Sequence, residues 1–238
     1  MNKVILSPSI MCADLLNLKE SVRQLEKSGV DALHIDIIDG QFSPSMPLGI
    51  DTVKKLRSIT ELPFDVHIMS VNNPWFVNEM LDIGVQQISF HHETTLHADR
   101  LINVIKRRGV RAGIALNPAT SLSVLDAILP QVDCLLLMLI NPGFAGDSSE
   151  TQVSYAKEKV AHAAEIIHRR GLQTDIQVDG RVSLKLIPQL VGAGASNLVL
   201  GSTSLYQAGN TFEQNLQLLD ESIQAGLSLR NQFAKEEV

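Results

Sequence analysis

Short apolar runs alternate with helix-like stretches along the whole chain. Each run is rich in Val, Ile or Leu, and most are followed by a stretch in which apolar residues recur at helical spacing. This alternation is typical of repeated βα units, in which helices cover a parallel sheet. Eight strands are predicted: Val4–Pro8, Leu33–Ile37, Phe64–Met69, Gln87–Phe90, Ala112–Leu116, Cys134–Leu139, Asp175–Val178 and Asn197–Leu200.

Apolar stripes and terminal residues mark the helices between these strands. Two helix starts are predicted, one where Asn73 precedes Pro74 and one where Asn210 stands three residues before Glu213, as in a capping box. Glycines that can end a helix follow four of the helical stretches, at Gly29, Gly84, Gly109 and Gly171. Four stripes have helical spacing: Leu15, Leu18, Val22 and Leu25; Ala98, Leu101, Ile102 and Ile105; Val153, Ala156, Val160 and Ile167; and Phe212, Leu216, Leu219 and Ile223.

Eight such units predict an α/β fold of the closed (β/α)₈ type, the TIM barrel, as a single domain over residues 1–238. An open flavodoxin-like or Rossmann sheet is the alternative, but it usually stops at five or six strands. No G-x-G-x-x-G follows the first strand, which also counts against a Rossmann sheet. The charged segment of about 227–238 is predicted to fray or to pack on a partner.

Composition agrees with one compact domain and narrows the function. Apolar residues make up 45% of the chain and charged residues 19%, and no stretch has the composition of a linker. The net charge of −6 opposes binding to nucleic acid or to an anionic membrane, whereas a small anionic substrate is still allowed. No signal peptide is recognised, and no apolar run approaches the ~20 residues that span a bilayer. With only two cysteines, Cys12 and Cys134, we expect a cytoplasmic protein with reduced thiols.

Four polar residues interrupt or end the apolar strands at His34, Asp36, His67 and Asp179. Residues i and i+2 of a strand share a face, so His34 and Asp36 can point to one place. In a closed barrel the carboxyl ends of all strands meet at one mouth, which brings the other two close. Taken singly, each residue is explained as well by a structural role as by a ligand role: an Asp can cap a helix, and a His can be a hydrogen-bonded core residue. Together they predict a site for one divalent metal ion, Zn²⁺, Fe²⁺, Mn²⁺ or Co²⁺.

This ligand set suits proton transfer next to a ketone. A metal on the ketone oxygen would stabilise the enediolate that forms when the neighbouring carbon loses a proton. Asp36 and Asp179 come from strands well apart in the ring, so one can remove the proton and the other can return it to the opposite face. Such an exchange inverts a stereocentre.

Glycine-containing loops follow the last three strands, where barrels often bind phosphate. They are Asn141–Gly146, Asp179–Arg181 and Leu200–Ser202. A glycine after a strand most often makes a turn, but three such loops at consecutive strands favour phosphate binding. Ser9, Met69 and Met138 are expected at the same mouth, and His91 and His92 at its rim, although a turn role for Ser9 and a core role for the methionines are alternatives.

These motifs resemble the ribulose-phosphate 3-epimerase family over most of the chain. The resemblance rests on Ser7-Pro-Ser-Ile10, His34-Ile-Asp36, Asp39-Gly40, Asp65-Val-His67-Ile-Met69, Asn117-Pro118, Asn141-Pro-Gly-Phe144, Val178-Asp-Gly180 and Gly201-Ser202. It implies a barrel that converts D-ribulose 5-phosphate to D-xylulose 5-phosphate in a cytoplasmic homo-oligomer. It also implies Asp36 and Asp179 as the acid/base pair and His34, Asp36, His67 and Asp179 as metal ligands. The substrate contacts that it implies are Ser9, His67, Gly143, Phe144, Ala145, Gly146, Gly180, Gly201 and Ser202. Met69, Met138 and Arg181 are predicted to contact the substrate because they lie at or just after strand ends at the same mouth.

The chain departs from the family pattern around the substrate and not at the metal. The family usually has Met-Asp-Gly, Phe-Val-Pro-Asn, Gly-Phe-Gly-Gly and Val-Asp-Gly-Gly. This chain has Ile38-Asp39-Gly40, Phe42-Ser-Pro-Ser45, Gly143-Phe-Ala-Gly146 and Val178-Asp-Gly-Arg181. Arg181 could obstruct the phosphate or bind it through its guanidinium.

Three alternatives to the ribulose-phosphate reaction therefore stay open. The first is a 3-epimerase of a hexulose phosphate such as D-allulose 6-phosphate. The second is a barrel that binds phosphosugars without turnover. The third is another barrel enzyme such as a metal-assisted aldolase or a decarboxylase; a Schiff-base aldolase is disfavoured because no predicted strand ends in Lys.

Overall fold

Eight parallel strands form one sheet in the computed structural model, which describes residues 3–144 and 146–236. The sheet order is β1-β8-β7-β6-β5-β4-β3-β2, and a parallel bridge between Ser9 and His34 joins β1 to β2 and closes the ring. The predicted barrel is confirmed, and every predicted strand is present with its ends within one residue of those expected. The strands are β1 (Ile5–Pro8), β2 (Leu33–Ile38), β3 (Phe64–Met69), β4 (Gln87–His91), β5 (Arg111–Leu116), β6 (Cys134–Met138), β7 (Asp175–Asp179) and β8 (Asn197–Leu200).

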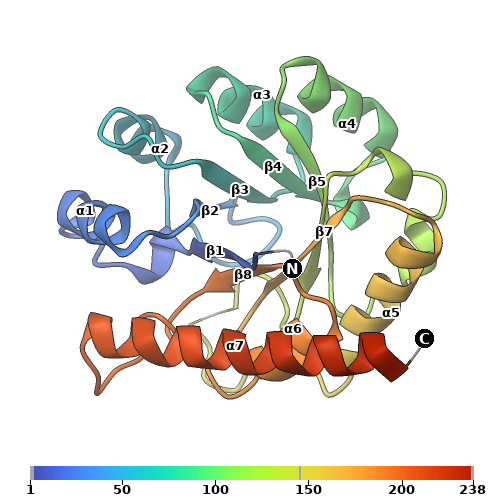
Figure 1. Ribbon diagram of the computed structural model, residues 1–238. Helices are drawn as coiled ribbons and strands as arrows, with labels where there is room; N and C mark the ends of the chain where they lie inside the picture. The colour runs from blue at the N-terminus through green and yellow to red at the C-terminus, as the bar shows by residue number, and fades with distance from the viewer. Residues whose placement is uncertain (1–2, 145, 237–238) are drawn as a thin grey trace.

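Helices surround the strands on the outside of the ring (Figure 1). The α-helices are α1 (Leu18–Ser28), α2 (Ile50–Arg57), α3 (Asn73–Ile83), α4 (Ala98–Arg107), α5 (Ala156–Arg169), α6 (Ile187–Ala193) and α7 (Phe212–Glu236). Four short 3₁₀ helices lie in connections: η1 (Ile10–Cys12), η2 (His92–Thr94), η3 (Leu122–Leu125) and η4 (Leu129–Gln131). None of the described helices is both long and apolar enough to cross a membrane.

The connection between β5 and β6 departs from a regular βα unit. The fully described segment 117–133 contains η3 and η4 where an α-helix would stand. Pro118 and Pro130 lie near its ends, and proline lacks the amide hydrogen and disfavours an α-helical residue before it. Leu122, Leu125 and Leu129 are nevertheless buried, so these short turns cover the sheet as a helix would.

Most helix ends follow the sequence prediction, with one correction. Gly29 and Gly84 end α1 and α3 in the left-handed conformation, at φ 75° and φ 84°. The predicted capping box at Asn210 and Glu213 is wrong by one residue. Thr211 and Gln214 form it instead, because each side chain accepts a hydrogen bond from the other residue's backbone N–H, at 2.8 and 3.2 Å.

The segment of about 227–238, predicted to fray or to pack on a partner, belongs to helix α7 as far as Glu236, and residues 237–238 lie outside the described residues. Arg230 on this segment donates hydrogen bonds to the carbonyl oxygens of Val191 and Ala195 at the end of α6, at 2.6–2.8 Å. Gly226 lets the two helices approach closely, since a Cβ there would lie 2.6 Å from the Cβ of Val191. These contacts hold α7 against α6 through Arg230.

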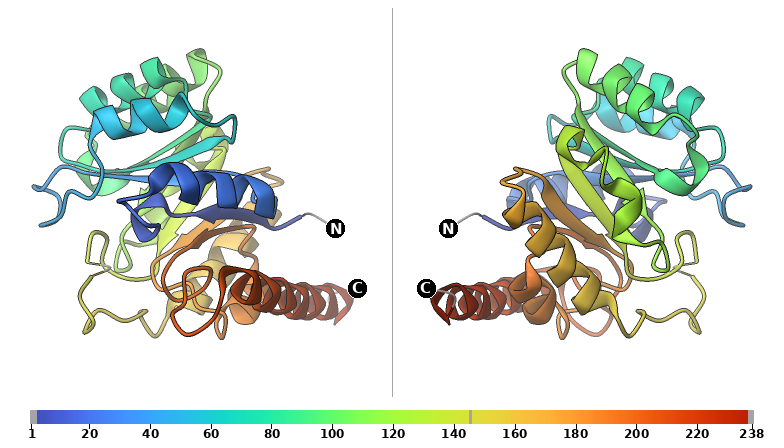
Figure 2. Two further views of the ribbon diagram at one scale, coloured as in Figure 1. Left: turned by 90° about the vertical axis from the view of Figure 1, so that its left-hand side faces the viewer. Right: turned by 90° about the vertical axis from the view of Figure 1, so that its right-hand side faces the viewer.

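Buried apolar residues fill the space between sheet and helices, and polar residues lie inside the ring. β2 and β3 are buried at every position, as expected of parallel strands covered on both faces. Leu33, Ile35 and Ile37 alternate with His34 and Asp36, so one face of β2 belongs to the core and the other to the site. Figure 2 shows both termini at one end of the barrel and the connections after β2 and β6 at the other end.

Candidate metal centre and active site

The register of β2 and β3 places four polar side chains inside the barrel. His34 is paired with Asp65 and Asp36 with His67, and in each strand the two polar residues are two positions apart. All four are buried, and neither histidine side chain has any exposed surface. The alternation of each strand and the pairing between them therefore build one polar cluster from two neighbouring strands.

Asp179, the last residue of β7, completes a group of four possible metal ligands with His34, Asp36 and His67. Asp36 Oδ1 lies 3.5 Å from His34 Nε2 and 3.6 Å from His67 Nδ1. Asp179 Oδ2 lies 3.8 Å and 3.4 Å from the same two nitrogens. The four candidate ligand atoms all lie within 4.8 Å of one another, so a single ion could contact all of them.

The two imidazole nitrogens that face this point indicate what the cluster is built to hold. Among the residues that the structure describes, neither His34 Nε2 nor His67 Nδ1 has a hydrogen-bond partner, and both are fully buried. A buried polar atom without a partner is costly. A cation would use both nitrogen lone pairs and offset the repulsion between the two carboxylates. The cluster could therefore bind a divalent metal, and its N₂O₂ composition fits any of the four ions predicted.

A buried carboxylate supports His34 from behind. Its Nδ1 lies 2.8 Å from Asp65 Oδ2, and Asp65 also accepts hydrogen bonds from the side-chain amides of Gln87, at 2.7 Å, and Gln177. Burial alone would lower the pKa of His34, but the carboxylates of Asp36 and Asp65 outweigh it and raise that pKa well above its usual value. The ring is therefore fixed at one nitrogen and open to the centre at the other.

A second histidine, His91, supports His67. The Nε2 atoms of the two rings lie 2.9 Å apart, and His91 Nδ1 lies 3.2 Å from Glu93 Oε2. Burial lowers the pKa of His91 to about 4, so this ring is neutral. His91 was expected at the rim of the pocket; it instead lies fully buried behind His67. As the last residue of β4, it continues the inward face of that strand.

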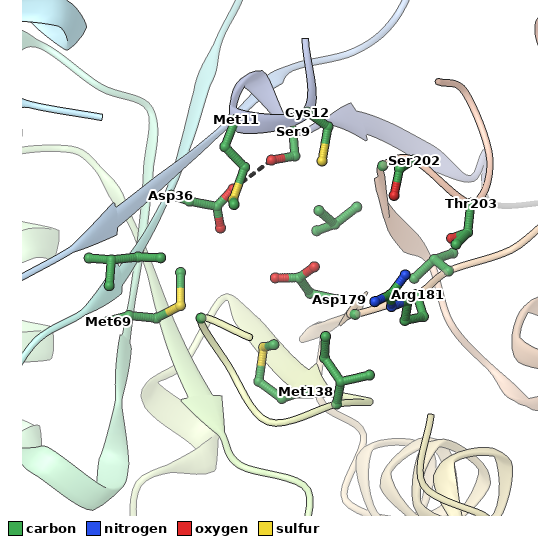
Figure 3. A pocket seen from close by; sticks show the side chains of 17 residues that line it. Ser9, Met11, Cys12, Asp36, Met69, Met138, Asp179, Arg181, Ser202 and Thr203 are labelled. Atoms are coloured by element: carbon green, nitrogen blue, oxygen red, sulfur yellow. Dashed lines mark hydrogen bonds between the residues drawn. The ribbon is translucent and has the colours of Figure 1, made fainter. Parts of the chain in front are cut away.

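A pocket opens beside the candidate ligands (Figure 3). Asp36 and Asp179 reach it from β2 and β7, with Met11, Met69 and Met138 around them. Ser9 donates a hydrogen bond of 2.5 Å to Asp36 Oδ2. The described lining residues are Ser9, Met11, Cys12, Asp36, Ile38, Met69, Met138, Ile140, Gly143, Asp179, Gly180, Arg181, Val182, Val199, Gly201, Ser202 and Thr203.

Two of the pocket glycines are required by packing within the protein. A Cβ on Gly180 would lie 2.7 Å from Ile140 Cγ1 and 2.9 Å from the Ile140 amide nitrogen, and its φ of 105° also disfavours a side chain. A Cβ on Gly143 would lie 1.8 Å from Ser43 Oγ. These contacts join the loops after β2, β6 and β7, so both glycines are explained without an anion.

Arg181 connects the end of β7 to the loop after β6. Its backbone has a φ of 52°, the only positive φ among the described non-glycine residues. Its Nη2 donates to the carbonyl oxygen of Asp147 at 2.7 Å, and its own carbonyl oxygen accepts a hydrogen bond of 2.9 Å from Gln152 Nε2. Among the described lining residues it is the only cationic side chain.

The structure brings most, but not all, of the predicted site residues together. His34 and His67 lie in the ligand cluster. Phe144 and Gly146 are not among the lining residues, and Ala145 lies outside the described residues. The predicted substrate contacts that do line the pocket are Ser9, Met69, Met138, Gly143, Gly180, Arg181, Gly201 and Ser202.

Three supporting residues, Asp65, Gln87 and Gln177, were not predicted. The sequence does contain a signal for Asp65, because it precedes His67 by two positions, as His34 precedes Asp36, and so faces the same interior. Gln87 and Gln177 are polar residues in buried strands of a barrel. A buried amide needs a partner, and the buried carboxylate between these strands is the group that they bind.

Comparisons with known proteins agree with this geometry. Residues 5–205 match the model of the ribulose-phosphate 3 epimerase family. The chain is 37% identical to the ribulose-phosphate 3-epimerase of Treponema pallidum, over 83% of this chain and 89% of that protein. It is 36% identical to the protein of the same name from Bacillus subtilis, over 82% of this chain and 89% of the relative. For the Escherichia coli protein of that name, the identity is 34% over 85% and 89% of the two chains.

Solved structures with low sequence identity share the fold. A native KDPGal structure superposes with a TM-score of 0.65 at 16% identity, covering 96% of this chain and 98% of the other. A mutant tryptophan synthase alpha-subunit from Pyrococcus furiosus gives a TM-score of 0.60 at 16% identity, covering 96% and 100%. The family match and the curated relatives go further than the fold. The chain therefore belongs to the ribulose-phosphate 3-epimerase family and is an isomerase of that type, a carbohydrate epimerase.

Proposed function

We propose that the protein is a metal-dependent epimerase that inverts carbon 3 of a ketose phosphate and converts D-ribulose 5-phosphate to D-xylulose 5-phosphate. One observation carries this proposal. Two carboxylates from β2 and β7 reach one pocket and share one point with two buried imidazole nitrogens that have no hydrogen-bond partner among the described residues. The names of the curated relatives support the same substrate.

His34, Asp36, His67 and Asp179 would hold the metal. When bound, a divalent ion would supply a Lewis acid that stabilises negative charge on the ketone oxygen of the sugar. The support behind the ligands keeps their orientation fixed. Asp65 holds the His34 ring, and the Ser9 hydroxyl holds the outer oxygen of Asp36.

Asp36 and Asp179 would exchange the proton at carbon 3. β1 and β8 lie between their strands in the ring, so the two side chains enter the pocket from different directions (Figure 3). Removal of the proton by one carboxylate leaves a planar carbon. Protonation by the other, from the opposite face, inverts the configuration. Met69 and Met138 would contact the sugar carbons and help to exclude water.

The phosphate would bind where the loops after β7 and β8 meet. Ser202 brings a hydroxyl to the pocket wall beside Gly201, and Arg181 brings a positive charge. Such a group would suit a phosphate dianion in a protein that is otherwise negatively charged. We also propose that residues 1–238 fold as one domain and that the enzyme forms homo-oligomers.

Proton exchange with solvent tests the two-carboxylate mechanism directly. Metal-replete protein in D₂O should introduce deuterium at carbon 3 of D-ribulose 5-phosphate. Asp36→Asn and Asp179→Asn should each lower the rate of conversion to D-xylulose 5-phosphate by at least about 10³-fold, because inversion needs both proton carriers. Circular dichroism should show both variants folded. Undiminished conversion in either folded variant would contradict the assignment.

A hexulose phosphate such as D-allulose 6-phosphate is a second candidate substrate, and Arg181 is the observation that favours it. A side chain occupies the position after Gly180 and changes the wall of the pocket on the phosphate side. A panel of five-carbon and six-carbon ketose phosphates, compared by kcat/KM, distinguishes the two substrates. The same panel detects cleavage products, released carbon dioxide, or binding without exchange, which are the outcomes expected of an aldolase, a decarboxylase or a non-catalytic barrel.

A further inference from the structure

A continuous series of polar contacts leads from the metal centre towards the end of β5. His67 Nε2 contacts His91 Nε2 at 2.9 Å, and His91 Nδ1 contacts Glu93 Oε2 at 3.2 Å. The other oxygen of Glu93 accepts hydrogen bonds from the backbone N–H of Asn117, at 2.7 Å, and from the hydroxyl of Thr120. The two imidazoles are fully buried, whereas the side chain of Glu93 is 22% exposed.

Donor and acceptor counting allows one arrangement of hydrogens along this series. If His67 offers the lone pair of Nδ1 to a metal, its Nε2 must carry the hydrogen. His91 Nε2 must then accept that hydrogen bond, so the hydrogen of the neutral His91 ring is on Nδ1. That Nδ1–H points at Glu93, whose carboxylate can only accept. In this arrangement every contact in the series pairs a donor with an acceptor. Moving the hydrogen of either ring to its other nitrogen would leave two donors or two acceptors facing each other.

His34 is fixed in the opposite sense. Its Nδ1 bonds the buried Asp65, so Nδ1 carries the hydrogen and Nε2 faces the centre. The two histidines therefore need opposite tautomers to present lone pairs to the same point. An imidazole in solution exchanges between tautomers, so two different supporting groups are needed to select them.

We propose that His91 and Glu93 are positioning residues that hold His67 in its Nε2–H tautomer and so direct Nδ1 at the metal. This inference rests on the proposed metal site. It assigns a role to the residues at the end of β4, which belong neither to the group of four candidate ligands nor to the described lining of the pocket.

The surroundings of His91 make it a fixed support. Phe42 packs against its ring, with the ring centroids 4.6 Å apart. Thr95 Oγ1 donates to its carbonyl oxygen at 2.9 Å. Glu93 accepts hydrogen bonds from the connection after β5. The position of the His67 ring therefore depends on β3, β4 and β5 together. The Glu93 charge is separated from His67 by a whole ring, so we expect a smaller effect from Glu93 than from His91.

Nitrogen NMR of the protein labelled with nitrogen-15 in histidine tests the tautomers directly. In zinc-loaded protein, we expect His67 to carry hydrogen on Nε2 and metal on Nδ1, and His91 to carry hydrogen on Nδ1. His34 should show the reverse of His67, which provides an internal control. A His91 ring with hydrogen on Nε2, or on both nitrogens, would overturn the inference while leaving the metal site intact. Absence of zinc binding by the wild-type protein would contradict the metal site and this inference together.

Zinc affinity, measured by competition with a chelator, tests the consequence. His91→Phe preserves much of the ring volume but removes the acceptor, and it should weaken zinc binding about 10–100-fold. His91→Gln restores a carbonyl acceptor and should retain most of the affinity. Glu93→Gln should weaken it less than His91→Phe. His162→Phe, on the exposed face of α5, is the matched control and should bind as the wild type does.

The contrast between the two His91 variants separates positioning from packing. Thermal unfolding of the metal-free proteins shows whether each variant folds. Zinc affinities are then compared among the folded variants. If His91→Phe binds zinc as tightly as the wild type, or if a folded His91→Gln loses as much affinity as His91→Phe, hydrogen bonding by His91 does not position His67.

Discussion

On one side of the barrel mouth, β2, β3 and β4 present polar side chains from within regular strands, whereas on the other side β6, β7 and β8 end in loops. The strand side contains His34, Asp36 and His67, all of them buried. Asp65 supports His34 from behind, and His91 supports His67. The geometry of this side is determined by strand register, and the packing of the core allows little change in that register.

The loop side has a different construction. Gly143 lets the loop after β6 touch the loop after β2, and Gly180 lets the loop after β7 touch the loop after β6. Arg181 also bridges the loops after β6 and β7. Asp179 belongs to a strand, but its side chain is 16% exposed, compared with 4% for Asp36. The groups proposed for the chemistry are therefore held by rigid elements, whereas those proposed for substrate recognition are held by loops that can change sequence with less damage to the reaction.

Removal of the metal should have the largest effect and should separate the two sides. Chelation should abolish proton exchange at carbon 3, because the ion would stabilise the negative charge that forms on the ketone oxygen. Apart from Asp179, all the proposed ligands belong to the strand side. Zn²⁺, Fe²⁺, Mn²⁺ or Co²⁺ should restore it to different extents. The loop side should still bind inorganic phosphate in the metal-free protein, as measured by calorimetry. Full exchange activity after verified metal removal would show that the strand side does not act through an ion.

That expectation depends on residues which the sequence alone located well. The alternation in β2 placed His34 and Asp36 on one face, and the eight-unit pattern placed Asp179 at the same mouth. The support by Asp65 and His91 was not foreseen, because it depends on which residues of neighbouring strands lie opposite each other. Strand register comes from the packing of the whole ring and is not readable within one strand.

Asp65→Asn should have the next largest effect, and it tests how much the strand side depends on its support. The amide can still accept from His34 Nδ1–H, but it removes the charge that makes the ring a stronger ligand. Zinc affinity should fall about 10–100-fold. Asp133→Asn, a carboxylate at the opposite end of the barrel, is a control with no contact to the centre. Equal zinc affinity in Asp65→Asn and the wild type would show that the orientation of His34 needs no buried charge.

The loop side was harder to predict for a related physical reason. A glycine can allow a turn, a close approach of two backbones or the binding of an anion. The sequence does not distinguish these roles, because they depend on which residues lie beside the glycine in the fold. The packing of Gly143 on Ser43 joins segments about a hundred residues apart. Arg181 raises the same difficulty, since its contact with Asp147 depends on the path of the loop after β6.

Gly180→Ala should reduce the free energy of unfolding, with a smaller effect on metal binding. The new Cβ would meet Ile140 in a backbone conformation that disfavours side chains, and a cost of about 1–3 kcal/mol is expected. Urea unfolding of the metal-free protein measures it. Gly146→Ala in the loop after β6 is the control, because a Cβ there has open space. If the two variants are equally stable, the loop side is more plastic than its contacts indicate.

Arg181→Gly should have the smallest effect and addresses substrate selection. Replacing the guanidinium removes one charged contact to the proposed phosphate, so KM should rise about tenfold while kcat changes little. Part of any loss of stability should be offset, because glycine adopts a positive φ without strain. Comparing KM for five-carbon and six-carbon ketose phosphates shows whether Arg181 also selects chain length. An unchanged KM for both sugars, combined with lower stability, would make Arg181 only a connection between loops, and recognition would then rest on Gly201 and Ser202.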